Sequence, residues 1–250
     1  MEKTEKKENR YGLLGKDISY SFSQTYFTKK FEDSGLWNHS YENFDIPNID
    51  FFNAIISQKN IKGCNVTIPY KEQIIPFLKD IDPKAKQIGA VNTIKFTPNG
   101  LKGYNTDAYG FKKSMQPFLK PHHTKALILG TGGASKAIRF VLEELGISYS
   151  YVSRTKRKNQ FTYEELTKEI IESHTLIINC TPLGTAPNID QKPPIPYSCL
   201  GENHFLFDLI YNPEKTTFLK LGHQKGATTC NGLKMLRLQA EKSWEIWNSV

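Results

Sequence analysis

The feature that most restricts the fold of this chain is a glycine-rich turn, Gly130-Thr131-Gly132-Gly133-Ala134, between an apolar run and an amphipathic segment. The apolar run covers residues 126–129, and residues 137–145 carry apolar side chains at helical spacing. A strand, a tight glycine turn and a helix in this order are typical of the start of a doubly wound, parallel sheet. Apolar strands expected at 149–152, 175–180 and 205–209 continue the same rhythm.

The part of the chain before this turn has an α/β pattern of its own. Strands are expected at 11–15, 41–44 and 63–68, and helices at 24–31, at 49–56 and from Pro69 onward. Asn99-Gly100 predicts a β-hairpin between the runs 90–96 and 101–104. We therefore expect an α/β protein of two domains, 1–110 and a Rossmann-type domain 111–230, with residues 231–250 returning to the first domain as an amphipathic C-terminal helix.

The composition is that of an ordinary globular protein and limits the classes of partner. Lysine and arginine exceed aspartate and glutamate by 33 to 25, but the basic residues are scattered and form no stripe interleaved with aromatic residues. No apolar run approaches the roughly 18 residues of a membrane span. Residues 1–10 alternate in charge, as in a solvated tail and unlike a signal peptide. We expect a small-molecule substrate, with no nucleic-acid or membrane partner.

Cysteine and histidine give no sign of a disulfide framework or a metal site. The 4 cysteines lie far apart without a C-x-x-C pair, which favours a reduced, cytoplasmic setting. The pair His122-His123 has no third ligand at metal-site spacing, so we expect it in an exposed loop and expect no bound metal. The pattern leaves monomer and homodimer open.

Backbone N–H groups of the glycine turn lie at the N-terminus of the following helix, where the pyrophosphate of a dinucleotide binds. Ser135 stands in place of the third glycine of the usual fingerprint, and a tight turn without a ligand is the alternative. A triphosphate-binding loop is excluded, because it needs a glycine before Lys136 and a serine or threonine after it, where Ser135 and Ala137 stand. The turn therefore indicates a dinucleotide.

The end of the second strand after the turn distinguishes NAD from NADP. NAD-binding units carry an acidic residue there, about 20 residues past the turn, which bonds the ribose hydroxyls. This chain has Ser153-Arg154-Thr155-Lys156-Arg157-Lys158 instead. Guanidinium and hydroxyl groups bind a 2′-phosphate through charge-assisted hydrogen bonds, whereas a carboxylate would repel it. We expect NADP, bound by the turn and by Ser153, Arg154, Thr155 and Lys158, although a solvated basic loop also fits 156–158.

Two polar motifs, Asn65-Val66-Thr67-Ile68-Pro69-Tyr70-Lys71 and Gly103-Tyr104-Asn105-Thr106-Asp107, stand where a strand gives way to a helix. Lys71 falls in the first helical turn, where the dipole disfavours a cation and eases loss of a proton, as suits an acid/base catalyst. A surface lysine is the alternative, and position alone leaves both open. Asp107 could simply cap the next helix. A proton-handling pair beside a nucleotide turn is the outline of a redox enzyme.

Ordered segments spanning most of the chain resemble the shikimate dehydrogenase family. They are Gly15 through Ser21-x-Ser23, Asn65-Val66-Thr67-x-Pro69-x-Lys71, Gly89-Ala90-Val91-Asn92-Thr93, Gly103-Tyr104-Asn105-Thr106-Asp107, Gly130-x-Gly132-Gly133-Ala134, Ser153-Arg154-Thr155, Asn179-Cys180-Thr181-Pro182-Leu183-Gly184, Asp208-x-x-Tyr211-Asn212-Pro213 and Asn231-Gly232-Leu233-x-Met235-Leu236-x-x-Gln239-Ala240. The resemblance implies NADPH-dependent, reversible reduction of 3-dehydroshikimate to shikimate, in the biosynthesis of chorismate and the aromatic amino acids.

The resemblance also implies roles for single residues. Lys71 is the general acid/base, and Asp107 holds it and a substrate hydroxyl in place. Leu209 and Gly232 contribute backbone contacts near the nicotinamide. The residues implied to bind the carboxylate or ring hydroxyls of the substrate are Ser21 and Ser23, for the carboxylate, and Thr67, Asn92, Tyr211 and Gln239. Departures from the family pattern are Asp17, Tyr20 and Gln24 in the first motif, and Thr185 and Lys234 near the expected nicotinamide pocket.

Three other functions compete with this interpretation. An enzyme that also accepts quinate is not excluded by any residue, whereas Arg154 without a nearby acid argues against a preference for NAD. An NADP-sensing protein on a retired enzyme fold is disfavoured, because Lys71, Asp107 and Gln239 are intact. A short-chain dehydrogenase is suggested by Tyr26-x-x-x-Lys30, but this pair precedes the glycine turn, and that group has it downstream.

Overall fold

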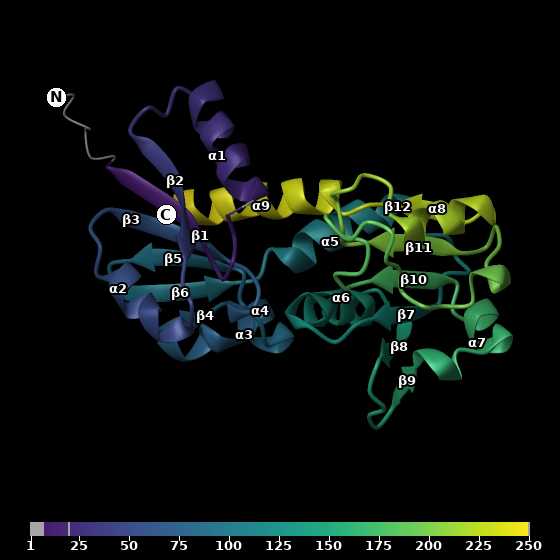
Figure 1. The fold of residues 1–250 in the computed structure, drawn as a ribbon. Coiled ribbons are helices and arrows are strands. Elements are labelled where there is room, and N and C mark those ends of the chain that lie inside the picture. Colours follow the sequence, from purple (N-terminus) through teal and green to yellow (C-terminus); the bar gives the residue numbers. More distant parts are fainter. Residues whose placement is uncertain (1–7, 20, 250) are drawn as a thin grey trace. The chain divides into compact units, whose positions relative to one another are not determined.

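The computed structural model describes residues 8–19 and 21–249 and divides the chain into two compact units. One unit comprises the described residues up to Thr106 together with those from Ala240 onward, and the other is Asp107–Gln239 (Figure 1). Of the segment 231–250 expected to return to the first domain, the described residues from Ala240 onward belong to the first unit and residues 231–239 to the second. Among the described residues, no helix combines the length and apolar character needed to span a bilayer.

The first unit is built on a mixed six-stranded sheet in the order β2-β1-β3-β5-β6-β4. β1 pairs with β2 and β3 in parallel, β5 pairs with β3 and β6 antiparallel, and β4 lies parallel to β6. The hairpin predicted at Asn99-Gly100 is confirmed as β5–β6, with Gly100 at φ +115°. The strands are β1 (Asn9–Gly15), β2 (His39–Asp45), β3 (Ile61–Val66), β4 (Asp80–Ile81), β5 (Thr93–Thr97) and β6 (Gly100–Tyr104).

Helices cover both faces of this sheet because its central strands are apolar on both sides. One core cluster joins Leu14, Val66 and Ile94 of the strands to Phe52, Ile74 and Ala85 of the helical segments α2 to α4. The opposite cluster joins Tyr11, Phe27 and Trp247 beneath α1 and α9. The helices are α1 (Phe22–Asp33), α2 (Phe52–Ile56), α3 (Tyr70–Gln73), α4 (Pro83–Ile88) and α9 (Leu233–Asn248).

The helix expected from Pro69 onward is shorter than its apolar pattern suggests. Pro69 is the residue before α3, and after Gln73 the chain continues as a separate 3-10 turn at Ile75–Phe77. Pro76 explains the break, since proline lacks the N–H that an α-helix needs and its ring clashes with the preceding turn. The apolar face itself is confirmed: Ile74 is fully buried, and Ile75 and Leu78 pack against the same core.

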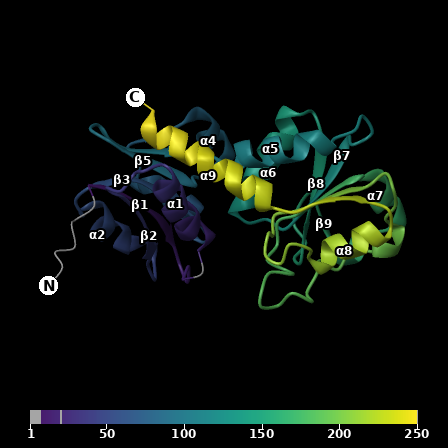
Figure 2. The same ribbon diagram turned by 90° about the horizontal axis from the view of Figure 1, so that it is seen from above.

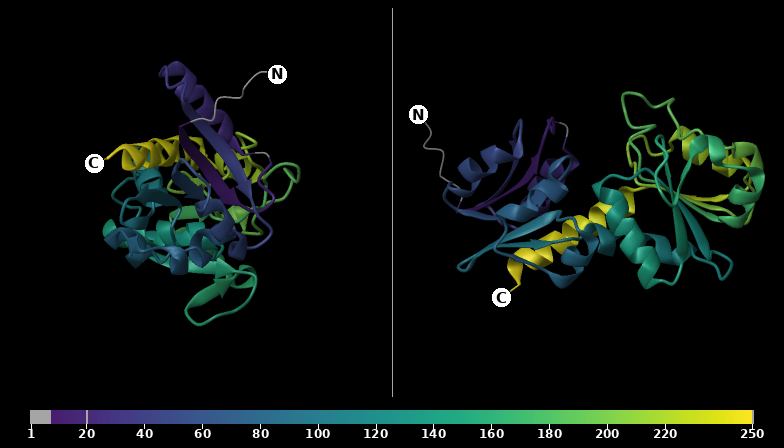
Figure 3. Two further views of the ribbon diagram at one scale, coloured as in Figure 1. Left: turned by 90° about the vertical axis from the view of Figure 1, so that its left-hand side faces the viewer. Right: turned by 90° about the horizontal axis from the view of Figure 1, so that it is seen from below.

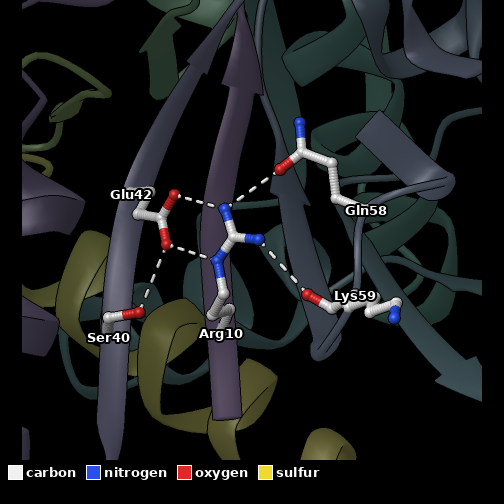
Figure 4. A network of polar contacts seen from close by, with 5 residues as sticks. All are labelled: Arg10, Ser40, Glu42, Gln58 and Lys59. Atoms are coloured by element: carbon white, nitrogen blue, oxygen red, sulfur yellow. Dashed lines mark hydrogen bonds and ion pairs between the residues drawn. The ribbon is translucent and has the colours of Figure 1, made fainter. Parts of the chain in front are cut away.

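The expectation of a solvated tail over residues 1–10 is wrong for Asn9 and Arg10, which form the start of β1, while residues 1–7 lie outside the described part. The Arg10 guanidinium donates to both carboxylate oxygens of Glu42 on β2, at 2.8 and 2.7 Å, and to the side chain of Gln58 and the carbonyl of Lys59 (Figure 4). This network ties β1 to β2 and to the turn before β3, so tertiary contacts order a segment whose composition is that of a tail.

The second unit contains a fully parallel six-stranded sheet in the order β12-β11-β10-β7-β8-β9. The chain moves outward from β7 in one direction and then returns to build the other side, which confirms the doubly wound sheet. The order reverses between β7 and β10, and ligands of such sheets bind at the carboxyl ends of the strands at this point. The strands are β7 (Lys125–Leu129), β8 (Ser148–Ser153), β9 (Gln160–Thr162), β10 (Leu176–Asn179), β11 (Phe205–Asp208) and β12 (Thr228–Cys230).

Helices also cover both faces of the second sheet (Figure 3). On one face Phe111 of α5 packs edge-on against Phe207 of β11, with ring centroids 5.0 Å apart. On the other face Ile171 of α7 and Phe218 of α8 share a core with Leu127 and Ile177 of the strands. The helices of this unit are α5 (Asp107–Met115), α6 (Gly133–Glu144), α7 (Lys168–Ser173) and α8 (Thr217–Gln224).

The expectation that His122 and His123 share an exposed loop is half wrong. His122 is exposed, but His123 is buried against Phe205 of β11. Its Nδ1 accepts a hydrogen bond from the Lys120 N–H at 2.9 Å, and its Nε2 lies 3.3 Å from the Asn203 carbonyl oxygen. These partners require the neutral ring with its proton on Nε2, and burial lowers the pKa of His123 accordingly. The ring fills the core beside the sheet.

Helix α9 is one continuous helix that belongs to both units (Figure 2). Its second part packs on the first sheet through Trp247, whose indole N–H donates to the Ile94 carbonyl at 3.0 Å. A side chain at Gly63 would lie only 2.2 Å from that indole nitrogen. Gly63 is therefore the site on β3 where the helix and the sheet make their closest approach.

Candidate active site

Ser21, a predicted ligand of the substrate carboxylate, is the residue directly before α1 in the first unit. Its hydroxyl does not cap the helix, and its oxygen is buried without a hydrogen-bond partner among the described residues. A buried hydroxyl left without a partner is costly, and the N-terminus of a helix favours anions. Ser21 thus presents an unused donor at a position suited to a carboxylate.

Ser23 belongs to a chain of buried polar groups that crosses the first unit. Its hydroxyl bonds the Tyr41 phenol, whose pKa burial raises well above its ordinary value. Tyr41 donates to Asn65 Oδ1 at 2.8 Å, and Asn65 Nδ2 donates to Ser243 on α9 at 2.9 Å. The same amide lies 3.3 Å from the Asn92 carbonyl. Ser23 is therefore fixed through the core to the strand end that carries Asn92.

Asn92 and Thr106 hold each other at the end of the β5–β6 hairpin. Asn92 Oδ1 accepts from the Thr106 N–H at 2.7 Å, and Asn92 Nδ2 donates to Thr106 Oγ1 at 3.0 Å. Asp107 follows directly as the first residue of α5 and is 6% exposed. This clamp closes the open end of the hairpin, directly before the residue at which α5 begins.

Thr67 and Lys71 stand on either side of the exposed Ile68 and Pro69, just after β3. The Thr67 methyl group occupies the space of the missing Gly15 side chain, since a Cβ at Gly15 would lie 2.6 Å from it. Lys71 is half-buried, and its carbonyl accepts from the Val91 N–H at 2.8 Å. Because α3 has only four residues, the helix-dipole argument made for Lys71 from the sequence is weak.

The loop before Ser21 has a support of its own where the sequence departs from the family pattern. The Asp45 carboxylate at the end of β2 accepts the N–H groups of Asp17 and Ile18, at 2.9 and 3.1 Å. Gln24 accepts from Asn43 Nδ2 at 3.1 Å. Of the departures in this motif, Asp17 and Gln24 are thus placed by strand β2, and Tyr20 lies outside the described residues.

In the second unit the glycine turn stands between β7 and α6. Gly130 has φ +97°, and Gly132 is the extended residue before α6, with no heavy atom within 4 Å of where its Cβ would be. The Ser135 hydroxyl donates to the Gly132 carbonyl at 2.7 Å, so it closes the turn from within. The open space at Gly132 and the N-terminus of a 12-residue helix fit the pyrophosphate of a dinucleotide.

Ser153 and Arg154 lie at the end of β8, beside the turn. The Gly130 N–H donates to the carbonyl of Val152, the residue before Ser153, at 2.8 Å. Within the described part of the chain the exposed Arg154 guanidinium takes part in no ion pair, whereas Lys156 pairs with Glu165. Thr155 and Lys158 are exposed in the same loop. The guanidinium next to the turn is the cation that the sequence assigns to a 2′-phosphate.

Leu209 and Gly232 are brought together by the loops after β11 and β12. A Cβ at Gly232 would lie 2.1 Å from the Leu209 carbonyl oxygen, so only glycine permits this approach. The Gly232 N–H donates to the Ile210 carbonyl at 3.0 Å. Tyr211 is half-buried, and burial raises the pKa of its phenol. The backbone of residues 209–211 is thus presented at the carboxyl edge of the sheet.

Gln239, which helical spacing alone would place on an exposed face, is 9% exposed on α9. Its Nε2 donates to the Leu236 carbonyl at 2.9 Å. A Cβ at Gly110 of α5 would lie 3.2 Å from the Gln239 Cβ, so the two helices touch here. Like Tyr211, Gln239 belongs to the second unit, whereas Ser21, Ser23, Thr67, Lys71 and Asn92 belong to the first.

Asn179 and Asp208 carry polar side chains whose roles sequence reasoning missed. They end the neighbouring strands β10 and β11, face each other in register, and are both fully buried. Both lie within matched family segments, but no role was assigned to them. The available signal was a polar residue closing an otherwise apolar strand, in Leu-Ile-Ile-Asn and in Phe-Leu-Phe-Asp.

Tyr26 and Lys30, the pair that suggested a short-chain dehydrogenase, serve a packing contact. Both side chains bond the carboxylate of Glu241, and Lys30 Nζ lies 2.7 Å from Glu241 Oε2. The contact joins α1 to α9 within the first unit, and the glycine turn lies in the other. This arrangement removes the basis for that alternative.

Comparison with known proteins identifies the family. Residues 13–94 match the family model described as the shikimate dehydrogenase substrate binding domain. Shikimate dehydrogenase (NADP(+)) of Clostridium botulinum strain Loch Maree is 37% identical over 246 residues, which cover 94% of this chain and 95% of that protein.

Solved structures agree as well. The crystal structure of shikimate dehydrogenase 1 from Peptoclostridium difficile has a TM-score of 0.83 at 41% identity, covering 96% of this chain and 91% of its own. That of shikimate 5-dehydrogenase from Thermus thermophilus, in complex with NADP(H) and shikimate, has a TM-score of 0.85 at 29% identity, covering 97% and 94%. Such identity over nearly the whole length establishes that this chain belongs to the shikimate dehydrogenase family.

Proposed function

We propose that this protein is an NADP-dependent shikimate dehydrogenase. It would reduce 3-dehydroshikimate to shikimate with NADPH, and oxidise shikimate with NADP⁺ in the reverse direction, as a step toward chorismate and the aromatic amino acids. Family membership over nearly the full chain is the observation that carries the proposal. The Thermus thermophilus relative was solved with NADP(H) and shikimate, which supports the same pair of ligands here.

The second unit supplies the groups that suit the cofactor. When bound, NADPH supplies the hydride that reduces the ketone. The open turn at Gly130, Thr131, Gly132, Gly133 and Ala134 would receive the pyrophosphate on backbone N–H groups. Charge-assisted bonds to the 2′-phosphate would come from Arg154, with Ser153, Thr155 and Lys158 around it. Leu209 and Gly232 would then border the nicotinamide with backbone atoms alone.

The first unit supplies the groups that suit the substrate. Ser21 and Ser23 would bind the carboxylate at the start of α1. The Ser21 hydroxyl supports this role, since it has no hydrogen-bond partner among the described residues. Two hydroxyls bind an anion without adding a second charge to the site. Ring hydroxyls of the substrate would be bonded by Thr67 and Asn92, and by Tyr211 and Gln239 from the second unit.

Lys71 would act as the general acid and base. Hydride arriving at the ketone carbon leaves negative charge on the oxygen, and an ammonium that gives up a proton to that oxygen stabilises it. In the reverse direction the neutral amine takes the proton of the shikimate hydroxyl. Asp107 would hold Lys71 and a substrate hydroxyl in orientation, as the family resemblance implies.

The direct test is the formation of NADPH, followed by absorbance, with shikimate or quinate and with NADP or NAD. We expect turnover with shikimate and NADP. Comparable rates with quinate would make this a dual-specificity enzyme, and a clear preference for NAD would refute the role given to Arg154. Absence of turnover with either substrate, in protein shown to be folded, would contradict the proposal.

Replacement of the general acid tests the mechanism. Lys71→Ala should lower kcat by about 10²–10⁴-fold, the usual contribution of a positioned proton donor, with little change in KM for shikimate. Lys86→Ala on the exposed side of α4 is the matched control and should turn over at the wild-type rate. Unchanged kcat in Lys71→Ala would remove Lys71 from the mechanism.

A further inference from the structure

Asp208 is a fully buried carboxylate at the carboxyl end of β11, and polar groups from different segments converge on it. Its Oδ1 accepts from Asn179 Nδ2 at 3.0 Å and from the Ile210 N–H at 3.1 Å. Its Oδ2 accepts from the Thr216 hydroxyl at 2.6 Å. Carboxylates are acceptors on both oxygens, which is why this group satisfies all of these donors at once.

The first oxygen of Asp208 organises the turn after β11. Ile210 is held on both sides, because its N–H bonds Asp208 and its carbonyl accepts from the Gly232 N–H at 3.0 Å. The Leu209 N–H is bound in turn by the Asn179 carbonyl at 3.0 Å. Residues 209 and 210 therefore have little freedom, and the close approach of Gly232 to the Leu209 carbonyl depends on this conformation.

The second oxygen of Asp208 has a separate task. Thr216 is the residue before α8, and its Oγ1 also accepts the Leu219 N–H at 3.3 Å, which caps the helix. Loss of this arm affects the start of α8 and leaves the bond to Ile210 in place. The two arms can thus be removed one at a time.

Burying a carboxylate costs folding free energy unless a cation compensates its charge. Among the described residues, the groups that affect Asp208 include hydrogen-bond donors and no cation. Burial raises the pKa of Asp208 to about 6, and only its hydrogen bonds act in the opposite direction. A purely structural junction could use an amide at less cost to the fold. What Asp208 supplies at this edge of the sheet is a pair of oxygens that hold donors from separate segments, Asn179, Ile210 and Thr216.

We propose that Asp208 is a positioning residue for hydride transfer, whose Oδ1 fixes the Leu209–Tyr211 turn against Gly232. This inference rests on the proposed function, which puts Leu209 and Gly232 beside the nicotinamide and Tyr211 on the substrate. Asp208 itself touches neither ligand. It acts through Ile210, so its loss displaces backbone at the reacting centre. The glycine turn, to which Asp208 makes no hydrogen bond in the described part of the chain, keeps its geometry.

The test compares Asp208→Ala, Asp208→Asn and Thr216→Val with the wild type. Misplacement of reacting groups by about 1 Å costs on the order of 10²-fold in rate, so kcat of Asp208→Ala should fall by about that factor. Asp208→Asn keeps an oxygen for Asn179 and Ile210, and should stay within about tenfold of the wild type. Thr216→Val should lower the melting temperature and leave kcat nearly unchanged.

Two readouts separate positioning from general loosening. The Kd for NADPH, measured by its fluorescence, should change by less than about threefold in every variant, because the turn at Gly130–Ala134 is untouched. Hydrogen exchange of the peptide covering residues 209–211 should speed up in Asp208→Ala and not in Thr216→Val. If Asp208→Ala does not fold, Asp208→Ser takes its place, since a serine hydroxyl is too short to serve both Asn179 and Ile210.

The wild-type enzyme is assayed first, so that absence of shikimate oxidation counts against the proposed function alone. With an active wild type, a folded Asp208→Ala whose kcat lies within twofold of it would overturn the inference. An equal loss of kcat in Asp208→Ala and Thr216→Val would overturn it too, because destabilisation would then explain both.

Discussion

Single polar residues at the strand ends of this protein are fixed by buried hydrogen bonds more than by ion pairs. Asn92 clamps Thr106 in the first unit, and in the second Asn179 binds both the N–H and the hydroxyl of Thr181 at 3.0 and 2.7 Å. Exposed ion pairs such as Lys102–Asp80 contribute little, because water and salt screen the attraction. Loops at the edge of each sheet therefore receive their geometry from neutral partners beneath them, which salt does not screen.

Arg154 should decide the choice of cofactor. Charge-assisted hydrogen bonds are worth about 1.5–3 kcal/mol, so Arg154→Ala should raise KM for NADP by roughly 10- to 150-fold. KM for NAD, which lacks the 2′-phosphate, should change little. Lys156→Ala is the control, because Lys156 is already paired with Glu165. Steady-state kinetics with both cofactors measure this, and an equal rise in both KM values would argue against a phosphate contact.

Asp208 should make stability depend on pH in the direction opposite to a salt-bridged acid. Its pKa is raised from 3.8 to about 6 in the folded state, so the folded protein binds more protons than the unfolded chain between these values. Stability therefore falls as pH rises through this window, by up to about 3 kcal/mol. Urea unfolding at several pH values should show the free energy of unfolding of Asp208→Asn increasing relative to that of the wild type from pH 4 to 7. If the difference in unfolding free energy between the two proteins did not change with pH, Asp208 would not be a buried carboxylate that titrates in this range.

Among the elements, α9 depends most on a single close contact. Trp247 lies over Gly63 of β3 and bonds the Ile94 carbonyl, while Ser243 joins the buried network with Asn65 and Thr93. A helix normally packs 8–10 Å from its neighbour, and a large side chain approaches a strand closely only where the strand has no Cβ. The seam between α9 and the sheet is thus both apolar and specific.

Gly63→Ala should disturb this seam. The added Cβ would lie 2.2 Å from the Trp247 indole nitrogen, which forces the ring and its hydrogen bond to move. Overpacking of a core costs about 1–3 kcal/mol. Thermal unfolding should show a clear fall in melting temperature, whereas Gly201→Ala, where nothing lies within 4 Å, should change it little. Equal melting temperatures for the two variants would show that Trp247 can move aside to admit the added Cβ at little cost.

The chain as a whole is organised so that the first unit is completed only by its last residues. Ala240 and Trp247 share a core with Tyr11 and Phe27, although they are distant in sequence from the strands and from α1. The second unit needs no segment from before Asp107 to complete its sheet. The two units therefore differ in how strongly they rely on contacts between distant parts of the sequence.

Deletion of residues 240–250 should consequently unfold the first unit and spare the second. Loss of one buried Trp alone costs about 3–5 kcal/mol, a large part of the 5–15 kcal/mol that stabilises a typical domain. Limited proteolysis followed by mass spectrometry should show cleavage within residues 8–106 and protection of 107–239. Glu245→Ala, on the exposed side of α9, should show the wild-type pattern. Protection of both units after the deletion would contradict this account.

Several features could be predicted because local sequence encodes them. Apolar runs and helical spacing mark β7, β8, β10, β11 and α6, whereas β9, β12, α7 and α8 were not predicted. The φ of +97° at Gly130 is a conformation that glycine adopts freely. The absence of an acid after β8 and the presence of Arg154 are equally local. The family resemblance rests on ordered motifs and needs no structure. The break at Pro76 was overlooked, although proline itself signals it. The polar residues Asn179 and Asp208, which close apolar strands, were overlooked as well.

Other features were decided by tertiary contacts that no local pattern reports. Arg10 looks like part of a charged tail until β2 supplies Glu42, and His123 looks like loop until Phe205 covers it. Asp208 resembles any acid after a strand, and only the register of β10 with β11 brings Asn179, Ile210 and Thr216 onto it. The physical reason is common to all: periodicity along the chain specifies which faces are apolar, whereas the partners of a buried polar group come from strands and loops far away in sequence.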